Sequence, residues 1–218
     1  MPSEFPGRPR LTKGALLVFE AQSAGAKPSQ RIVFSYNPDQ LRRSFAARSP
    51  QQQPQRTAAA REDVLRVPGP PVETITMSIQ LDAADQLAEP LLNRGTVEFG
   101  LHPVLAKLEL LLYPSSARVA QIERQAAQGA VQVAPASVPL VMLAWGDSRV
   151  VPVQLQSFTV TEEQFDPRLN PITAKVDIGM RVLTYMEFPR ASAGREAYIA
   201  HQKKKEQLAG LPSAGGPV

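Results

Sequence analysis

Residues 172–182 read ITAKVDIGMRV, and this stretch decides the fold. Apolar side chains at every second position alternate with polar or small ones, as in a β-strand with one buried and one solvent-facing side. At roughly 3.3 Å per residue the run spans about 40 Å, which exceeds a typical strand of about 5–6 residues. The strand-like pattern also extends backward, and we interpret residues 139–185 as a long antiparallel hairpin.

The strand expected before this one contains a change of phase. Over residues 150–163 the apolar side chains occupy odd positions up to Leu155 and even positions from Phe158 onward. Because side chains alternate between faces, a shift of one residue exchanges the buried and exposed sets. The sequence therefore predicts a β-bulge or sharp bend near residues 156–157.

The remaining segments make the chain mainly β. Alternating or apolar runs predict further strands over residues 14–20, 31–36, 40–46, 73–81 and 138–145. One strong amphipathic helix is expected over residues 102–113, because leucines recur there at helical spacing after Pro103. A weaker helix is expected over residues 117–128. The predicted fold is an antiparallel β-barrel or two packed sheets, of the kind found in tail tubes, with one flanking α-helix.

Composition divides the chain into a central domain and polar ends. Residues 1–11 are expected to be a flexible N-terminus, residues 12–188 the β domain, and residues 189–218 a polar C-terminal tail that includes a short charged helix. Within the domain, residues 48–71 are rich in glutamine, alanine and proline and cannot supply a core. We expect them to form an exposed insertion.

The bulk composition excludes several classes of protein. The 218 residues include no cysteine, so disulfides and thiolate chemistry are absent. No apolar run approaches the roughly 18–20 residues of a membrane helix, and the first residues show no secretory signal, so we expect no direct membrane insertion. The net charge of +4 is mild, and no basic stripe with interleaved aromatics is visible, so no nucleic-acid partner is expected.

Catalytic and metal-binding patterns are missing as well. The chain has two histidines, of which His102 reads as a helix-start residue and His201 falls in the expected tail. The adjacent Glu162 and Glu163 would point to opposite faces of a strand, so they cannot share an acid–base site. We expect a non-enzyme without catalytic residues, metal or cofactor.

Three runs of sequence resemble one family in order and spacing. They are Phe34-Ser35-Tyr36-Asn37-Pro38-Asp39-Gln40-Leu41, Pro139 to Trp145-Gly146, and Val153 to Phe165-Asp166. Together with the proline-rich approach to the strand at residues 73–81, they are similar to the N-terminal domain of the contractile injection system tube protein family. The resemblance covers roughly residues 12–188.

The resemblance implies a structural role in a phage-tail-like particle. Members are ring-forming baseplate adaptors that join the spike–hub to the inner tube and initiate tube growth, so a hexameric ring of this chain is implied. The implied partners are the spike–hub, inner tube and baseplate proteins, with assembly in the cytoplasm and a possible extracellular location after release. Four polar residues of the long strand become candidates for a channel wall or an inter-subunit face, namely Thr173, Lys175, Asp177 and Arg181.

One departure and two alternatives remain at this point. Such adaptors often carry a C-terminal LysM domain, for which residues 189–218 leave no room. The first alternative is a later layer of the inner tube. The second is a carbohydrate- or nucleic-acid-binding β-barrel, which would need exposed aromatics on a concave face, whereas aromatic residues make up only 6% of the chain.

Overall fold

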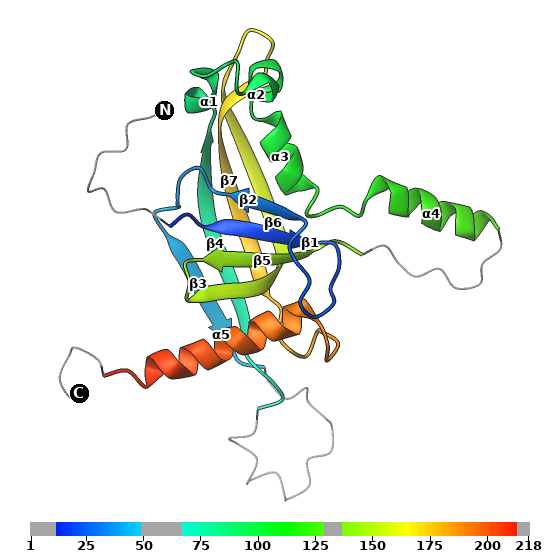
Figure 1. Ribbon diagram of the computed structural model, residues 1–218, viewed down its shortest axis with the longest axis vertical. Coiled ribbons are helices and arrows are strands. Elements are labelled where there is room, and N and C mark those ends of the chain that lie inside the picture. The colour runs from blue at the N-terminus through cyan, green and yellow to red at the C-terminus, as the bar shows by residue number, and fades with distance from the viewer. Residues whose placement is uncertain (1–11, 49–66, 129–136, 213–218) are drawn as a thin grey trace, which may run out of the picture.

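The computed structural model describes residues 12–48, 67–128 and 137–212 (Figure 1). Its strands are β1 (Ala15–Phe19), β2 (Gln30–Val33), β3 (Leu41–Ala46), β4 (Val72–Asp82), β5 (Leu140–Trp145), β6 (Arg149–Phe165) and β7 (Pro171–Val182). The predicted strands are therefore confirmed, with one shortened. The strand expected to reach Tyr36 ends at Val33, and the Tyr36 side chain is exposed rather than on the buried face.

All seven strands belong to one antiparallel sheet, in the order β2-β1-β5-β6-β7-β4-β3. The mainly β, antiparallel prediction is confirmed, and the strands form one open sheet in place of the expected barrel or two packed sheets. In the part of the chain that is described, β2 and β3 are the two edges of the sheet and do not pair with each other. They are joined by only seven residues, 34–40, so the sheet bends strongly although it stays open.

The bend lies in β6, where the sequence predicts it. The register between β6 and β7 shifts between Leu155 and Ser157, as expected of a β-bulge. Before the shift β6 pairs with β5 on one side and begins to pair with β7 on the other. Beyond the shift, β7 is its one partner among the described strands. In Figure 1 the strands β2, β1 and β5 cross in front of β4 and β7, and β6 connects the two layers.

The space between the layers holds one main hydrophobic core. The buried, alternating side chains of β4 and β7 meet those of β1, β5 and the first half of β6, with Leu16, Ile75, Leu143, Val151 and Met180 completely buried. Burying side chains of this size stabilises a fold by about 1.5–3 kcal/mol each. The long β7 strand is thus fixed by its apolar face, and its polar face is left outside.

Four helices fill the connection between β4 and β5. They are α1 (Ala84–Leu87), α2 (Arg94–Phe99), α3 (His102–Glu109) and α4 (Ser116–Ala127). The expected leucine stripe is confirmed, because Leu101, Leu105, Leu108 and Leu111 are buried against the core. The helix ends at Glu109, earlier than the expected Tyr113. The weaker expected helix is α4, which buries none of its residues and extends away from the sheet in Figure 1.

The C-terminal region differs from the expected polar tail. Ser192 caps the N-terminus of helix α5 (Ala193–Ala209), because its hydroxyl accepts a hydrogen bond from the Arg195 amide at 3.3 Å. It packs across one end of the sheet and buries Tyr198 and His201. A position that sequence reasoning assigned to a tail is therefore part of the folded domain.

Three expectations lie partly outside the described residues. The insertion at 48–71 is described only for residue 48 and residues 67–71, and the N-terminus only from residue 12. The end of the expected C-terminal tail falls in residues 213–218, which are likewise outside.

Gly100 links the helical connection to the sheet and gives a test of the fold. Its φ of +56° and ψ of −131° suit only glycine, and an added Cβ would lie 2.5 Å from the Pro171 carbonyl oxygen. Gly100→Ala should destabilise the protein by about 2–3 kcal/mol in urea denaturation. The matched control is Gly95→Ala within α2, where nothing lies near the new methyl group. It should be neutral or stabilising by up to about 1 kcal/mol, and equal losses in both variants would contradict this account.

Candidate functional site

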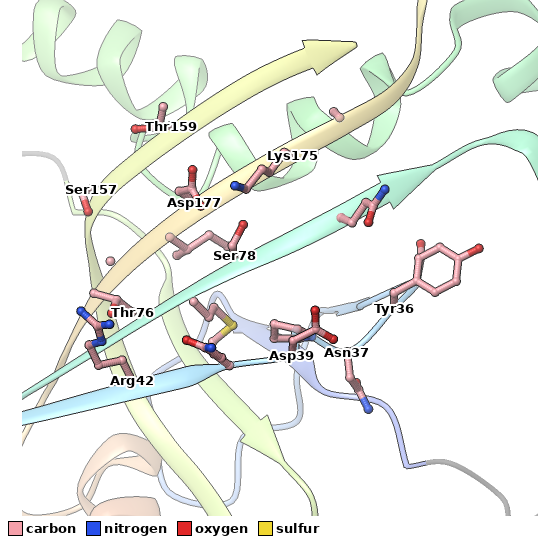
Figure 2. Close-up of a pocket in the computed structure, with 18 of the residues that line it drawn as sticks. Tyr36, Asn37, Asp39, Arg42, Thr76, Ser78, Ser157, Thr159, Lys175 and Asp177 are labelled. Carbon is pink, nitrogen blue, oxygen red and sulfur yellow. The ribbon is translucent and has the colours of Figure 1, made fainter. Parts of the chain in front are cut away.

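The polar face of β7 continues across the neighbouring strands. Lys175 pairs with Gln80 of β4 and Thr161 of β6, and Asp177 pairs with Ser78 and Thr159. These residues form rows of polar side chains across the three strands, because residues directly opposite each other in a sheet point to the same face. Figure 2 shows Lys175, Asp177, Ser78 and Thr159 on adjacent strands of this outer face.

The outer face is hollowed into a groove of about 1160 Å³, which we call the polar groove. Its floor is the polar face of β4, β7 and the second half of β6. The connection between β2 and β3 borders it, so that Tyr36, Asn37 and Pro38 line the same groove as Thr173, Lys175 and Asp177. Two sets of residues that are far apart in the sequence, and that were singled out for different reasons, are therefore brought together.

Asn37 has a structural task at the edge of this groove. Its side-chain oxygen accepts a hydrogen bond from the Gly14 amide at 2.8 Å, and its side-chain nitrogen donates to the Thr12 carbonyl at 3.0 Å. These bonds hold the connection between β2 and β3 against the start of β1. The neighbouring Leu41 packs partly against the core, whereas Tyr36 stays half exposed on the groove side.

The groove carries charges of both signs in equal number. Lys13, Arg42 and Lys175 face Asp39, Glu163 and Asp177. The cross-strand neighbours of Lys175 and of Asp177 are all uncharged, and the two residues lie two positions apart on the same face of β7. Because a second molecule could supply opposite charges here, the pattern suits contact with a protein of mixed charge better than contact with a polyanion.

Arg181 lies on the same face but in a different environment. Its guanidinium donates to Glu187 at 3.2 Å and to Gln154 at 3.1 Å. Burial opposes ionisation of Glu187, but hydrogen bonds from Thr184 and Arg48 outweigh it and keep the pKa of that carboxyl below its usual value. Arg181 therefore belongs to an ion-pair cluster at the end of the sheet and not to the polar groove.

The other residues taken from the resemblance have positions that explain them structurally. Trp145 is half buried at the end of β5, and a Cβ at Gly14 would lie 2.8 Å from its ring. Gly146 has a φ of +64° in the turn to β6. Asp166 accepts bonds from Arg168 and Asn170 in the turn to β7, and the Asn170 side chain foremost lowers its pKa. Phe165 is half exposed beside this turn.

The second half of β6 has a free side. Residues 156–165 pair with β7 on one side, and no other described strand pairs with them on the other. A strand edge presents backbone N–H and C=O groups that can accept the strand of another molecule. This open edge borders the polar groove, because Ser157, Thr159 and Glu163 line it.

Sequence reasoning missed a charged cluster under α5. Glu73 is 5% exposed, and its carboxylate contacts the Arg43 guanidinium at 2.6 Å and the Lys205 ammonium at 3.6 Å. Neither ring nitrogen of the buried His201 has a hydrogen-bond partner among the described residues. Burial first, and then the charges of Lys205 and Arg149, lower the pKa of His201. The sequence did contain a signal for this cluster. Glu73 occupies one of the alternating positions of β4 that are otherwise apolar and buried.

The described residues hold no cluster of potential metal ligands. No helix among them is long and apolar enough to cross a membrane. Glu162 and Glu163 are both exposed, as expected of solvated charge. Comparison of the chain with protein-family models and with curated proteins finds no match.

Asn37 provides a first test of the groove. Asn37→Ala removes both bonds to the start of β1 and should lower the free energy of unfolding by about 1–2 kcal/mol. The control is Asp39→Ala, an exposed position in the same connection, for which we expect less than about 0.5 kcal/mol. Both values can be measured by urea denaturation, and equal stability of the two variants would refute the structural task of Asn37.

His201 makes the stability depend on pH. The folded protein binds a proton on His201 more weakly than the unfolded chain does, whose histidine has a pKa of about 6.5. Stability should therefore be full above about pH 6.5 and decline as the pH falls below that value. His201→Leu should remove this decline in denaturation curves measured between pH 8 and pH 5, whereas the exposed His102→Gln should keep it. A decline that survives in His201→Leu would show that another group causes it.

Proposed function

We propose that the protein is a ring-forming structural adaptor of a phage-tail-like contractile injection system, which joins the spike–hub to the inner tube and initiates tube growth. One observation carries the proposal. The residues that resemble the tube protein family, Tyr36, Asn37 and Pro38, border a groove whose floor is the polar face of the long β6–β7 hairpin. This grouping of the motif residues and the polar strand face around one groove supports the proposal.

The proposed mechanism is geometric and involves no chemical step. A strand or hairpin of the neighbouring subunit would align with the open edge at residues 156–165, continuing the sheet from one subunit to the next. Such a contact joins two different surfaces, and repetition around an axis closes it into a ring. Six such contacts would close the ring around a shared channel.

The charges of the groove support this arrangement. The residues that pair with Lys175 and Asp177 on β4 and β6 are uncharged, so a neighbouring subunit can add charged contacts to both. Interfaces of this kind gain specificity and correct register from charge complementarity. The ion-paired Arg181 would contribute less to the ring, because its charge is already compensated by Glu187.

The alternatives fit the groove less well. Its three cations are matched by three carboxylates, and Tyr36 is its one aromatic lining residue among those described, so a polysaccharide or nucleic acid would find little to bind. A later layer of the inner tube would use the same ring contacts. A later layer would contact tube rings on both of its sides. The adaptor would contact the spike–hub on one side and a tube ring on the other. We favour the adaptor, with assembly in the cytoplasm and baseplate proteins as further partners.

Charge reversal at Lys175 tests the ring contact. The chain, alone and mixed with the spike–hub and inner tube proteins of the same particle, should form rings visible by negative-stain microscopy and measurable by light scattering. Lys175→Glu should raise the concentration needed for half-assembly by roughly tenfold, since a lost ion pair is replaced by repulsion. Lys27→Glu, the same change in the loop between β1 and β2, should leave it unchanged.

Three results would contradict the proposal or one of its parts. A stable monomer that ignores both purified partners at high concentration would exclude a ring-forming adaptor. Rings that form equally well with Lys175→Glu would show that the polar groove is not part of the contact between subunits. Particles of normal length from cells lacking the protein would argue against tube initiation in particular.

A further inference from the structure

The end of the molecule opposite the helical connection carries a second groove, of about 870 Å³. It lies between α5 and the end of β3, and we call it the edge groove. Phe45 is its lining residue from β3, and the segments after β3 and before β4 complete the wall with Ala47, Arg48, Val67, Gly69, Pro70 and Pro71. Phe45 of β3 lines it and remains 54% exposed, although its side chain points to the core face of the sheet together with Glu73. The core therefore does not close over the last strand of the sheet.

Helix α5 extends beyond the strand that it covers. All of its buried residues lie between Ala193 and His201, and none lies in the second half. The same helix face continues at Lys205 and Leu208, which follow His201 at helical spacing. Lys205 still reaches β4 and β3, at 3.6 Å from Glu73 and 5.9 Å from the Phe45 ring, whereas Leu208 is 46% exposed. Figure 1 shows α5 running past the end of β3 toward the C-terminus.

The strand beside this overhang has a free edge. In the described part of the chain, β3 pairs with β4 and with no other strand. A strand added to β3 would place its backbone against six residues of free edge, with one of its faces toward Phe45 and α5. The combination of an open strand edge and a flanking helix resembles the arrangement by which small domains hold extended peptides.

The charges around this edge have one dominant sign. Strand β3 carries Arg42 on its outer face and Arg43 on its inner face, and no carboxylate. Among the lining residues of the edge groove, α5 supplies the cations Arg195, Lys203 and Lys205 and one carboxylate, Glu206. The opposing Glu73 is buried and already paired with Arg43 and Lys205. An incoming strand would therefore meet cations on both of its faces.

We propose that the edge groove binds an extended, acidic segment of a partner protein, which adds as a strand to the free edge of β3 beneath the overhang of α5. Backbone hydrogen bonds to residues 41–46 would provide the affinity, and carboxylates near Arg195, Lys203 and Lys205 the selectivity. Apolar side chains of the segment would cover Phe45 and Leu208. This inference does not depend on the ring contact, which uses the other face of the sheet.

The test uses the full chain and two labelled decapeptides, EEVVEEVVEE and KKVVKKVVKK, which place both residue types on each face of a strand. Fluorescence anisotropy should show saturable binding of the glutamate peptide and none of the lysine peptide. Amide hydrogen exchange at residues 41–46 should slow when the glutamate peptide is bound. Absence of saturable binding, or protection confined to other strands, would overturn the proposal.

Two adjacent lysines of α5 supply a matched pair of variants. Lys203 lines the edge groove, and the exposed Lys204 does not. Lys203→Glu should weaken the glutamate peptide about fivefold, whereas Lys204→Glu should change its affinity less than about twofold. Equal losses in both would reveal attraction to overall charge only and would refute the site. Binding that appears only after residues 49–66 are deleted would identify that segment as the occupant, and the partner proposal would then be wrong.

Discussion

The structure depends on one close approach, that of Ser157 to Gly179. The bulge of β6 places Ser157 opposite Gly179 of β7, and a Cβ at position 179 would overlap the serine hydroxyl. Because the glycine leaves that space, the two strands stay paired on both sides of the bulge while β6 changes its facing. Leu155, before the bulge, can then point into the core between the layers. Phe158, after the bulge, packs against the same core although the two residues are an odd number of positions apart.

This bend also sets the outer surface. A straight β6 would put its two halves in one plane, and the polar residues of β7 would form a flat face. With the bend, the polar face becomes concave and the short connection between β2 and β3 reaches its rim. The fold and the candidate site therefore share a cause, and a change at Ser157 or Gly179 would affect both.

The sequence predicted the central strands because burial there follows a strict alternation. β4 and β7 each expose one face, so their period of two is visible, and the phase change in β6 marked the bulge within one residue. The openness of the sheet could not be predicted, since pairing between distant edges depends on the curvature of the whole sheet. A barrel or two packed sheets were expected, and one open sheet is found.

The candidate site was predicted only in part, for a similar reason. Thr173, Lys175 and Asp177 were identified by their alternation, but nothing local to the sequence shows that the connection containing Tyr36 would border them. The role of α5 was missed because its mean composition is polar. Only four of its residues are buried, including Tyr198 and His201. Their spacing along one helix face was the only sequence feature that distinguishes α5 from a fully solvated helix.

The strand order has a consequence for synthesis of the protein. The two hairpins made first, β1–β2 and β3–β4, end at opposite edges of the sheet, and neither contacts the other through strand pairing in the described chain. Each needs a partner from β5 to β7, so an emerging chain cannot assemble its sheet until the last third has left the ribosome. Pairing between segments so far apart in sequence is slow compared with local contacts. The nascent N-terminal half would meanwhile expose its apolar strand faces, which favours aggregation.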